Sequence, residues 1–166
     1  EGIAIYYQVS QDLAFWIAGG VAGVNWLQLS VIAPFILIGI FLVIFLSGEL
    51  NILSLGEDIA KSLGQRSQYI KLALLLLVLL LAGAAVSIVG SIMFVGLMVP
   101  HIARLWFKND YRWLIPGSAI LGAIFTVVAD AIAKTINAPF ETPLGAVVAI
   151  AGIPFFLYLV RRGGKP

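Results

Sequence analysis

The longest uncharged run in the sequence limits how this chain can fold more than any other feature does. The run extends over residues 72–103 and contains no Asp, Glu, Lys or Arg. As one straight helix it would be roughly 48 Å long at about 1.5 Å per residue, whereas the hydrocarbon core of a bilayer is about 30 Å thick. The run is therefore expected to cross a membrane once and then to break.

The composition places the chain among integral membrane proteins. Hydrophobic residues make up 61% of its 166 residues and charged residues only 11%, whereas soluble domains are about 45–50% apolar and about 25% charged. The absence of cysteine excludes disulfides and thiolate metal sites. A formal net charge of +2 gives no reason to expect a nucleic-acid partner.

Four segments are long and apolar enough to span a membrane, so we expect an all-α, polytopic helix bundle in contact with lipid. They are residues 26–47, 72–89, 114–134 and 144–160. Pro34 should kink the first of them. The apolar piece at 13–24 is too short to span. Because residues 1–12 begin at Glu1 and look like the interior of a protein, we expect the sequence to be part of a longer chain.

The long uncharged run offers several places to break, which are Gly83, Gly90, Gly96 and Pro100. Pro100 suits the first position of a new, short helix over 100–107. This half-helix can recross the membrane only if part of 90–99 is extended, at about 3.3 Å per residue. Irregular backbone at membrane depth must be buried in protein or line a cavity, and broken helices of this kind are typical of transporters.

The distribution of basic residues supports the return crossing. If residues 49–71 are cytoplasmic and the chain recrosses before 104, then 104–113 and 161–166 are cytoplasmic as well, and Lys134 is the only basic residue outside. A bias of this kind is the normal signature of cytoplasmic loops. The cytoplasmic basic residues are then Lys61, Arg66, Lys71, Arg104, Lys108, Arg112, Arg161, Arg162 and Lys165.

The polar segment 49–71 has the local signals of a folded element. Ser54 and Glu57 are spaced as a capping box, in which each side chain satisfies the other residue's backbone N–H. Glu57 and Lys61 are four residues apart with the acid first, the favourable order for a helical ion pair. Gly64 stands where a left-handed helix cap prefers glycine. We expect a helix of about two turns.

This short helix carries an apolar stripe that needs a covering surface. Leu55, Ile59 and Leu63 recur every four residues and share one face, and so short a helix is not stable alone in water. The lipid headgroups or the protein's own helices could cover the stripe. A soluble partner protein is the other possibility.

No residue pattern in the sequence predicts an enzyme. Residues 163–165 lack the spacing of a phosphate-binding loop, and Asp130 has no second intramembrane carboxylate to pair with. His101, the only histidine, is expected to be a structural hydrogen-bonding residue rather than a metal or haem ligand. Asp130 and Lys134 form either a simple ion pair at the outer interface or a docking site for an external partner.

Four stretches resemble the permease subunits of ABC importers for iron–siderophores, haem and cobalamin, which have the type II importer fold. The resemblance covers about residues 15–160, with the four stretches in the same order and spacing. Such permeases are about twice this length and have ten helices, so the chain looks like their second half. The stretches are LGEDIAKSLG (55–64), FVGLMVPHIARLWFKNDYRWLIPGSAILGA (94–123), VADAIAK (128–134) and ETPLGAVVAIAGIPFFLYL (141–159).

The resemblance implies roles for individual residues. Lys134 falls where the family usually has an arginine that pairs with an acidic residue of the binding protein, with Asp130 beside it; lysine keeps the charge but not the bidentate geometry. The final helix, 144–160, would lie near a dimer axis. Pro100, His101 and Arg104, after Gly90 and Gly96, match the start of a short structural helix. The segment implied to contact the ATPase comprises Leu55, Gly56, Glu57, Ile59, Ala60, Leu63 and Gly64.

The expected function is therefore that of a multi-pass cell-membrane permease, without cofactor, metal site or ATPase site of its own. It would import an iron chelate or a related large cofactor by alternating access. The implied partners are a cytoplasmic ATP-binding subunit, an extracytoplasmic substrate-binding protein and a second permease subunit. A secondary transporter driven by an ion gradient and a non-transporting structural membrane subunit are the alternatives.

Overall fold

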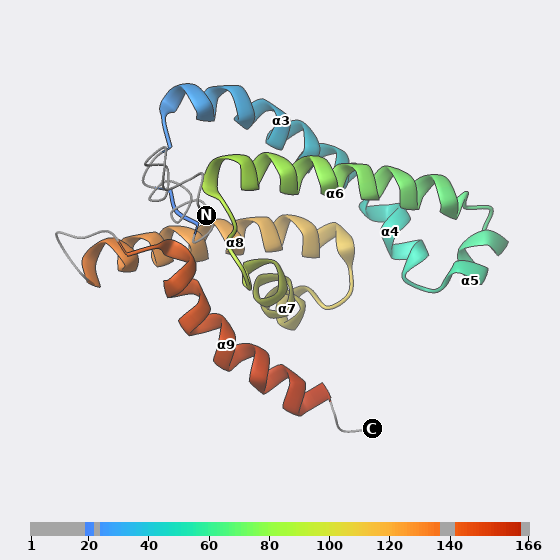
Figure 1. Ribbon diagram of the computed structural model, residues 1–166. Coiled ribbons are helices and arrows are strands. Elements are labelled where there is room, and N and C mark those ends of the chain that lie inside the picture. The colour runs from blue at the N-terminus through green and yellow to red at the C-terminus, as the bar shows by residue number, and fades with distance from the viewer. Residues whose placement is uncertain (1–18, 22–23, 137–141, 164–166) are drawn as a thin grey trace, which may run out of the picture. The chain divides into compact units, whose positions relative to one another are not determined.

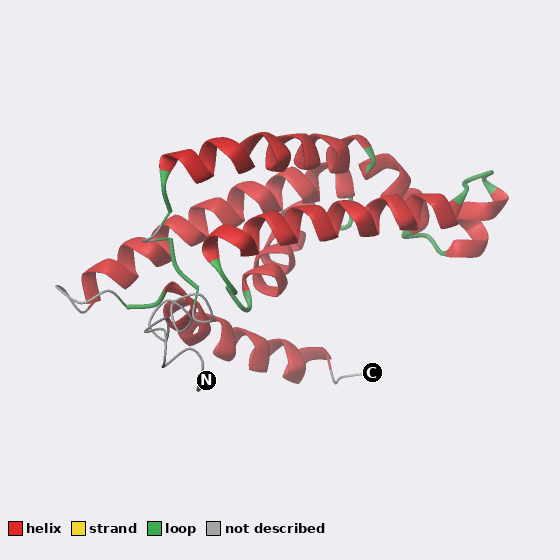
Figure 2. Cartoon of the chain, turned by 45° about the horizontal axis from the view of Figure 1, so that its top comes forward, coloured by secondary structure: helices red, strands yellow, loops and turns green. Residues whose placement is uncertain are grey.

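The computed structural model describes residues 19–21, 24–136 and 142–163, and these contain helices and loops but no strand (Figures 1 and 2). The predicted all-α fold is confirmed for this part of the chain. The expectations for residues 1–18, Glu141 and Lys165 lie outside it. The helices are α3 (Trp26–Phe45), α4 (Ser47–Leu53), α5 (Glu57–Ser62), α6 (Ser67–Val89), α7 (Val95–Phe107), α8 (Tyr111–Ile136) and α9 (Leu144–Gly163).

Four helices are long and apolar enough to cross a membrane, namely α3, α6, α8 and α9. They coincide with the four expected spans, but α6 begins five residues before the predicted 72 and α8 three residues before the predicted 114. The difference has a simple reason. Apolar length marks the stretch inside the hydrocarbon, whereas the backbone hydrogen bonds of a helix can continue into the polar residues beside it. Pro34 lies inside α3.

The prediction for the short helix was partly wrong. The break at Gly90 is present, since α6 ends at Val89 and Gly90 has a φ of +71°. However, α7 begins at Val95, so Pro100 lies inside the helix and does not start it. The chain turns at Phe94, whose φ is +67°, and helical backbone follows directly. The break between α6 and α7 therefore contains two positive-φ residues upstream of the proline, and only residues 90–94 between these two helices are non-helical.

The chain forms two compact units. Unit 1 contains the described parts of 1–24 and 122–166 together with 86–99, and unit 2 contains 25–85 and 100–121. The core of unit 1 is small. Ala129 on α8 and Leu144 and Val148 on α9 are almost completely buried. Against them pack Val21, Ile92, Phe94, Val95, Phe125 and Val147.

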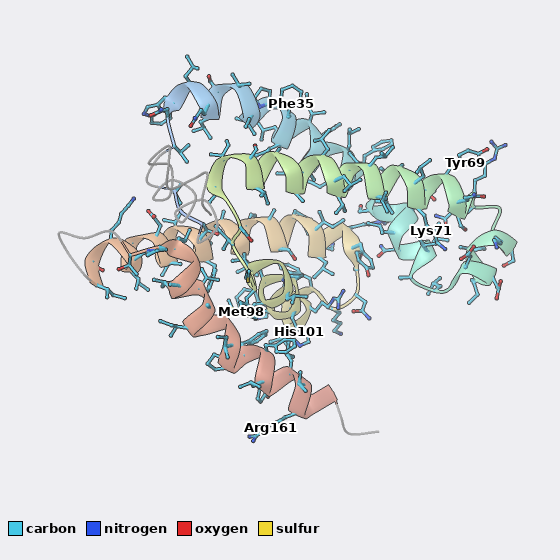
Figure 3. The ribbon with its side chains drawn as sticks, in the orientation of Figure 1. Phe35, Tyr69, Lys71, Met98, His101 and Arg161 are labelled. Carbon is cyan, nitrogen blue, oxygen red and sulfur yellow. The ribbon has the colours of Figure 1, made fainter. Side chains whose placement is uncertain are left out.

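Unit 2 is built on the pair α3 and α6, which run side by side in Figure 1. Gly39 makes this close approach possible, because a Cβ atom there would lie 2.6 Å from Cδ2 of Leu81. Small residues at such crossings are common between membrane helices. Most other side chains of the two helices are exposed, as expected where lipid or another subunit covers them; Phe35, labelled in Figure 3, is 56% exposed.

Candidate functional site

The short helix of the polar segment is α5, and a glycine sets its start. Gly56, the residue before the helix, has φ +115° and ψ 151°, a region that almost only glycine enters. The predicted capping box is therefore wrong. Glu57 is the first helical residue rather than the third, and the Ser54 hydroxyl instead donates to the carbonyl of Asn51 at 2.7 Å.

The end of α5 matches the prediction. Gly64 has a φ of +80°. Its N–H donates to the carbonyl of Lys61 at 2.9 Å, and the N–H of Gln65 donates to the carbonyl of Ala60 at 2.9 Å. This pair of bonds is the Schellman arrangement, which satisfies carbonyls that a helix end would otherwise leave free. Glycines thus fix both ends of a helix of six residues.

One carboxylate ties α5 to the beginning of α6. Glu57 pairs with Lys61 one turn along α5 at 3.0 Å, which confirms the predicted ion pair, and it also bonds to Lys71 of α6. Figure 3 shows Lys71 beside this part of the chain. The hydrogen bonds from Lys71 and then Lys61 hold the pKa of Glu57 below its usual value, so the carboxylate is ionised at neutral pH.

The apolar stripe on this segment is exposed to the surroundings. Leu55 is 60%, Ile59 49% and Leu63 63% exposed, whereas Ala60 on the other face is fully buried. Only Ile59 and Ala60 lie within α5, since the two leucines flank its ends. We call Leu55, Ile59 and Leu63 the apolar surface. Ala60, with no side chain beyond Cβ, lets α5 lie against the rest of unit 2 while this surface faces outward.

A second short helix, α4, supports α5 and was missed in the sequence. The side-chain amide of Gln65 donates to the carbonyl of Glu49 at 2.9 Å and to its carboxylate at 2.6 Å. The residue just after α5 is therefore held on α4. In the sequence, an apolar run ends at residue 47 and polar residues follow. This pattern indicates the end of a membrane span but gives no sign of a separate short helix.

Asn51 of α4 also reaches the turn before α8. Its Nδ2 donates to Oδ1 of Asp110 at 2.7 Å, and its Oδ1 accepts the N–H of Tyr111 at 2.8 Å. Asp110 precedes the first residue of α8 and accepts the N–H of Arg112 at 3.1 Å. An Asp before a helical pattern is a usual N-cap signal and could have been found. Nothing local in the sequence predicts its pairing with Asn51, 59 residues away.

The candidate docking pair is present in unit 1. Lys134 Nζ lies 2.7 Å from Oδ2 of Asp130 on the last turns of α8. The side chain of Asp130 is 24% exposed and that of Lys134 is 52% exposed. The predicted i, i+4 ion pair is confirmed. Docking of an external partner stays a prediction.

The remaining predicted structural residues are placed as follows. Gly96 lies in the first turn of α7, and no atom would meet a Cβ there. His101 is half-buried and is engaged with other groups. Arg104 is exposed in the last turn of α7, where a positive charge interacts favourably with the helix dipole. Within the described residues, no group of three His, Cys, Asp or Glu could hold a metal ion.

The Gly56→Ala substitution is expected to loosen α5. An alanine at these dihedral angles is strained by about 1–3 kcal/mol, although no atom would meet its Cβ. The amides of α5 should therefore exchange with solvent faster in hydrogen-exchange mass spectrometry. The matched control is Gly83→Ala in the interior of α6, which also has open space around the new Cβ. Unchanged exchange in the Gly56 variant would contradict the role given to this glycine.

Residues 2–162 match the model of the FecCD transport family. The chain is 52% identical over 162 residues to the iron(3+)-hydroxamate import system permease protein FhuB of Bacillus subtilis, covering 96% of this chain and 42% of that protein. It is 39% identical over 164 residues to the hemin transport system permease protein HmuU of Yersinia pestis, covering 97% of this chain and 49% of that protein.

A solved structure agrees with these relatives. It belongs to a protein assigned to the metal-chelate type of ABC transporter, in an inward-facing conformation, and matches with a TM-score of 0.85 at 31% identity over 92% of this chain and 49% of that one. The chain spans less than half of the length of each of these proteins. With a family model that matches nearly all of its residues and relatives of this similarity, the chain is a multi-pass membrane protein that belongs to the FecCD transport family.

Proposed function

We propose that this chain is part of the permease subunit of an ATP-driven importer that moves a ferric chelate inward by alternating access. The observation that carries the proposal is the exposed apolar surface, Leu55, Ile59 and Leu63, which lies on a short helix and at its two ends, where glycines fix the backbone. Membership of the family and relatives named as permeases of iron–hydroxamate and hemin import systems support the same function.

The proposed partner of the apolar surface is a cytoplasmic ATP-binding subunit. A soluble protein can bury leucine and isoleucine side chains in a groove, which favours association by about 25 cal/mol for each Å² of apolar area removed from water. The ion pairs of Glu57 and the bonds of Gln65 resist displacement of α5 relative to α4 and α6. When ATP closes the ATPase dimer, α4, α5 and the start of α6 would therefore move together with it. α5 would not be displaced alone.

The proposed topology places this segment in the cytoplasm. Residues 91–93, between the two positive-φ positions, can span about 10 Å when extended, and the 13 residues of α7 add about 20 Å. Together they match the hydrocarbon core, which is about 30 Å thick. With that return crossing, the basic residues near the ends of the spans lie on the cytoplasmic side except Lys134, as the positive-inside rule requires.

On the outer side, Lys134 and Asp130 are proposed to meet an extracytoplasmic substrate-binding protein, and α9 to face a second permease subunit. Lys134→Glu is expected to weaken the complex with the binding protein about tenfold or more, because a carboxylate of the partner would then face a like charge. Binding of the purified binding protein to the full-length permease in nanodiscs measures this. Lys134→Arg, which keeps the charge and adds bidentate geometry, should bind at least as well as lysine. If the wild-type permease and the Lys134→Glu and Lys134→Arg variants bind the binding protein with equal affinity, Lys134 is not part of the docking site.

Transport by the reconstituted complex tests the proposed function itself. The full-length permease that contains this sequence is purified with its ATPase and placed in proteoliposomes, with the binding protein and a radioactive ferric hydroxamate on the outer face. The proposal requires uptake that depends on ATP inside the vesicles. Uptake driven by a proton or sodium gradient without ATP, or binding of the partners with no flux at all, would contradict it.

A further inference from the structure

Two hydrogen bonds join α4 to the start of α8, and the proposed binding of α5 to the ATPase does not depend on them. The carboxamide of Asn51 uses both of its polar ends there, with Nδ2 donating to Oδ1 of Asp110 at 2.7 Å and Oδ1 accepting the N–H of Tyr111 at 2.8 Å. A carboxamide is the side-chain group that can donate and accept at the same time in one plane. We call these two hydrogen bonds the Asn51 clamp.

Asp110, the acceptor in the clamp, is held in place by a further hydrogen bond. Asp110 precedes α8 and accepts the N–H of Arg112 at 3.1 Å with the same oxygen that binds Asn51. The hydrogen bond from Asn51, and next that from Arg112, hold the pKa of Asp110 below its usual value. Asp110 is therefore an acceptor at neutral pH, and only a donor such as the Nδ2 of Asn51 fits opposite it.

The clamp connects the apolar surface to a long helix. Asn51 lies on α4, which runs directly into the turn at Ser54 and Leu55, and α4 also holds the far end of α5 through Gln65 and Glu49. α4 thus receives both ends of α5. At the other side of the clamp begins α8, which has 26 residues, is about 39 Å long, and contributes residues to both compact units.

The clamp is at most partly buried, since its bond to Tyr111 is half-buried, and this argues that it does not serve mainly for stability. The bond between Asn51 and Asp110 is exposed, and an open depression beside it is lined by Asn51, Ile52, Ser54, Leu55, Asn109 and Asp110. Hydrogen bonds that water can replace add little to the free energy of folding. Their two-point geometry, in contrast, fixes the position of the first turn of α8 relative to α4.

We propose that Asn51 is a positioning residue that transmits displacement of the α5 segment to α8 through its paired hydrogen bonds to Asp110 and Tyr111. The inference rests on the proposed function, because the displacement comes from the ATPase. A push on the apolar surface moves α4, the clamp moves the start of α8 with it, and the helix carries the movement along its length. Without the clamp, ATP hydrolysis continues but drives less transport.

The test compares four forms of the full-length permease, assembled with the ATPase and the binding protein in proteoliposomes with a radioactive ferric hydroxamate. Asn51→Asp keeps the acceptor for Tyr111 but places a carboxylate against Asp110. In this variant the number of ATP molecules hydrolysed for each chelate imported should rise about fivefold or more, while the melting temperature of the complex stays unchanged. Asp110→Asn keeps an acceptor for Asn51 and should behave as wild type. The double variant exchanges donor and acceptor, so it should restore the wild-type ratio.

Each outcome decides between distinct explanations. A wild-type ratio in Asn51→Asp, or a raised ratio that the double variant does not restore, would overturn the positioning role. If Asn51→Asp lowers the yield of assembled complex, Asn51→Ser gives the same comparison, because the shorter hydroxyl spans neither bond and adds no charge. If the wild-type complex itself shows no ATP-dependent uptake, the proposed function fails and the positioning role with it; wild-type uptake with an unchanged Asn51→Asp ratio overturns the positioning role alone.

Discussion

Replacing Glu57 by Lys and Leu63 by Arg in one variant is expected to remove about nine tenths or more of ATP-dependent uptake while membrane insertion continues. The first change puts a third positive charge beside Lys61 and Lys71, which now bind the carboxylate. The second puts a charge at one end of the apolar surface, which is proposed to enter a groove of the ATPase, and burying an unpaired charge costs several kcal/mol. A loss of 1.4 kcal/mol already weakens association about tenfold.

The matched control for this double variant is Gln68→Arg. Gln68 is exposed in the first turn of α6 and lies outside the apolar surface, so an added positive charge there should leave uptake near the wild-type value. Uptake and ATP hydrolysis are measured together in proteoliposomes. Normal uptake by the double variant would defeat the claim that this segment receives the movement of the ATPase.

Gly152→Ala is expected to destabilise unit 1 markedly. A Cβ at Gly152 of α9 would lie 2.5 Å from Cβ and 2.7 Å from Cγ of Phe94. These atoms sit close to a backbone that has positive φ, so they cannot move aside as the end of a flexible side chain could. Overpacking of this kind costs about 1–3 kcal/mol. The full-length permease in detergent should melt at a lower temperature.

The control for Gly152 is Gly96→Ala on α7. It makes the same chemical change inside a helix, where nothing lies within 4 Å of the new Cβ. Alanine is favoured over glycine in a helix by about 0.5–1 kcal/mol, so this variant should melt at the wild-type temperature or slightly above it. If the two variants melt alike, Phe94 and Gly152 do not pack as described.

Features that depend on apolar length or on neighbouring residues could be predicted from the sequence. The four spanning helices follow from runs without charge. The C-cap at Gly64 and the pair of Glu57 and Lys61 follow from spacings of a few residues. Their energies come from local backbone geometry, so the local pattern suffices. The resemblance of four separate stretches then led to the family that the comparisons confirm.

Features that depend on positive-φ backbone or on distant partners could not be predicted. Ser54 was expected to cap the helix, but the unusual dihedral angles of Gly56 move the start of the helix by two positions, to Glu57. Pro100 was expected to start α7, but the turn at Phe94 comes first. The partner of Asn51 is 59 residues away, and which polar side chains meet across such a distance depends on how whole helices pack, not on their spacing in the sequence.

The central claim is tested most directly by measuring on which side of the membrane Lys61 and Lys134 lie. α5 can contact a cytoplasmic ATPase only if it lies in the cytoplasm. The chain has no cysteine, so Lys61→Cys and Lys134→Cys each introduce a unique thiol in this part of the permease. A membrane-impermeant maleimide should label the Lys134 variant in intact cells and the Lys61 variant only in inverted vesicles. Labelling of both from the same side would contradict the topology and, with it, the coupling role of α5.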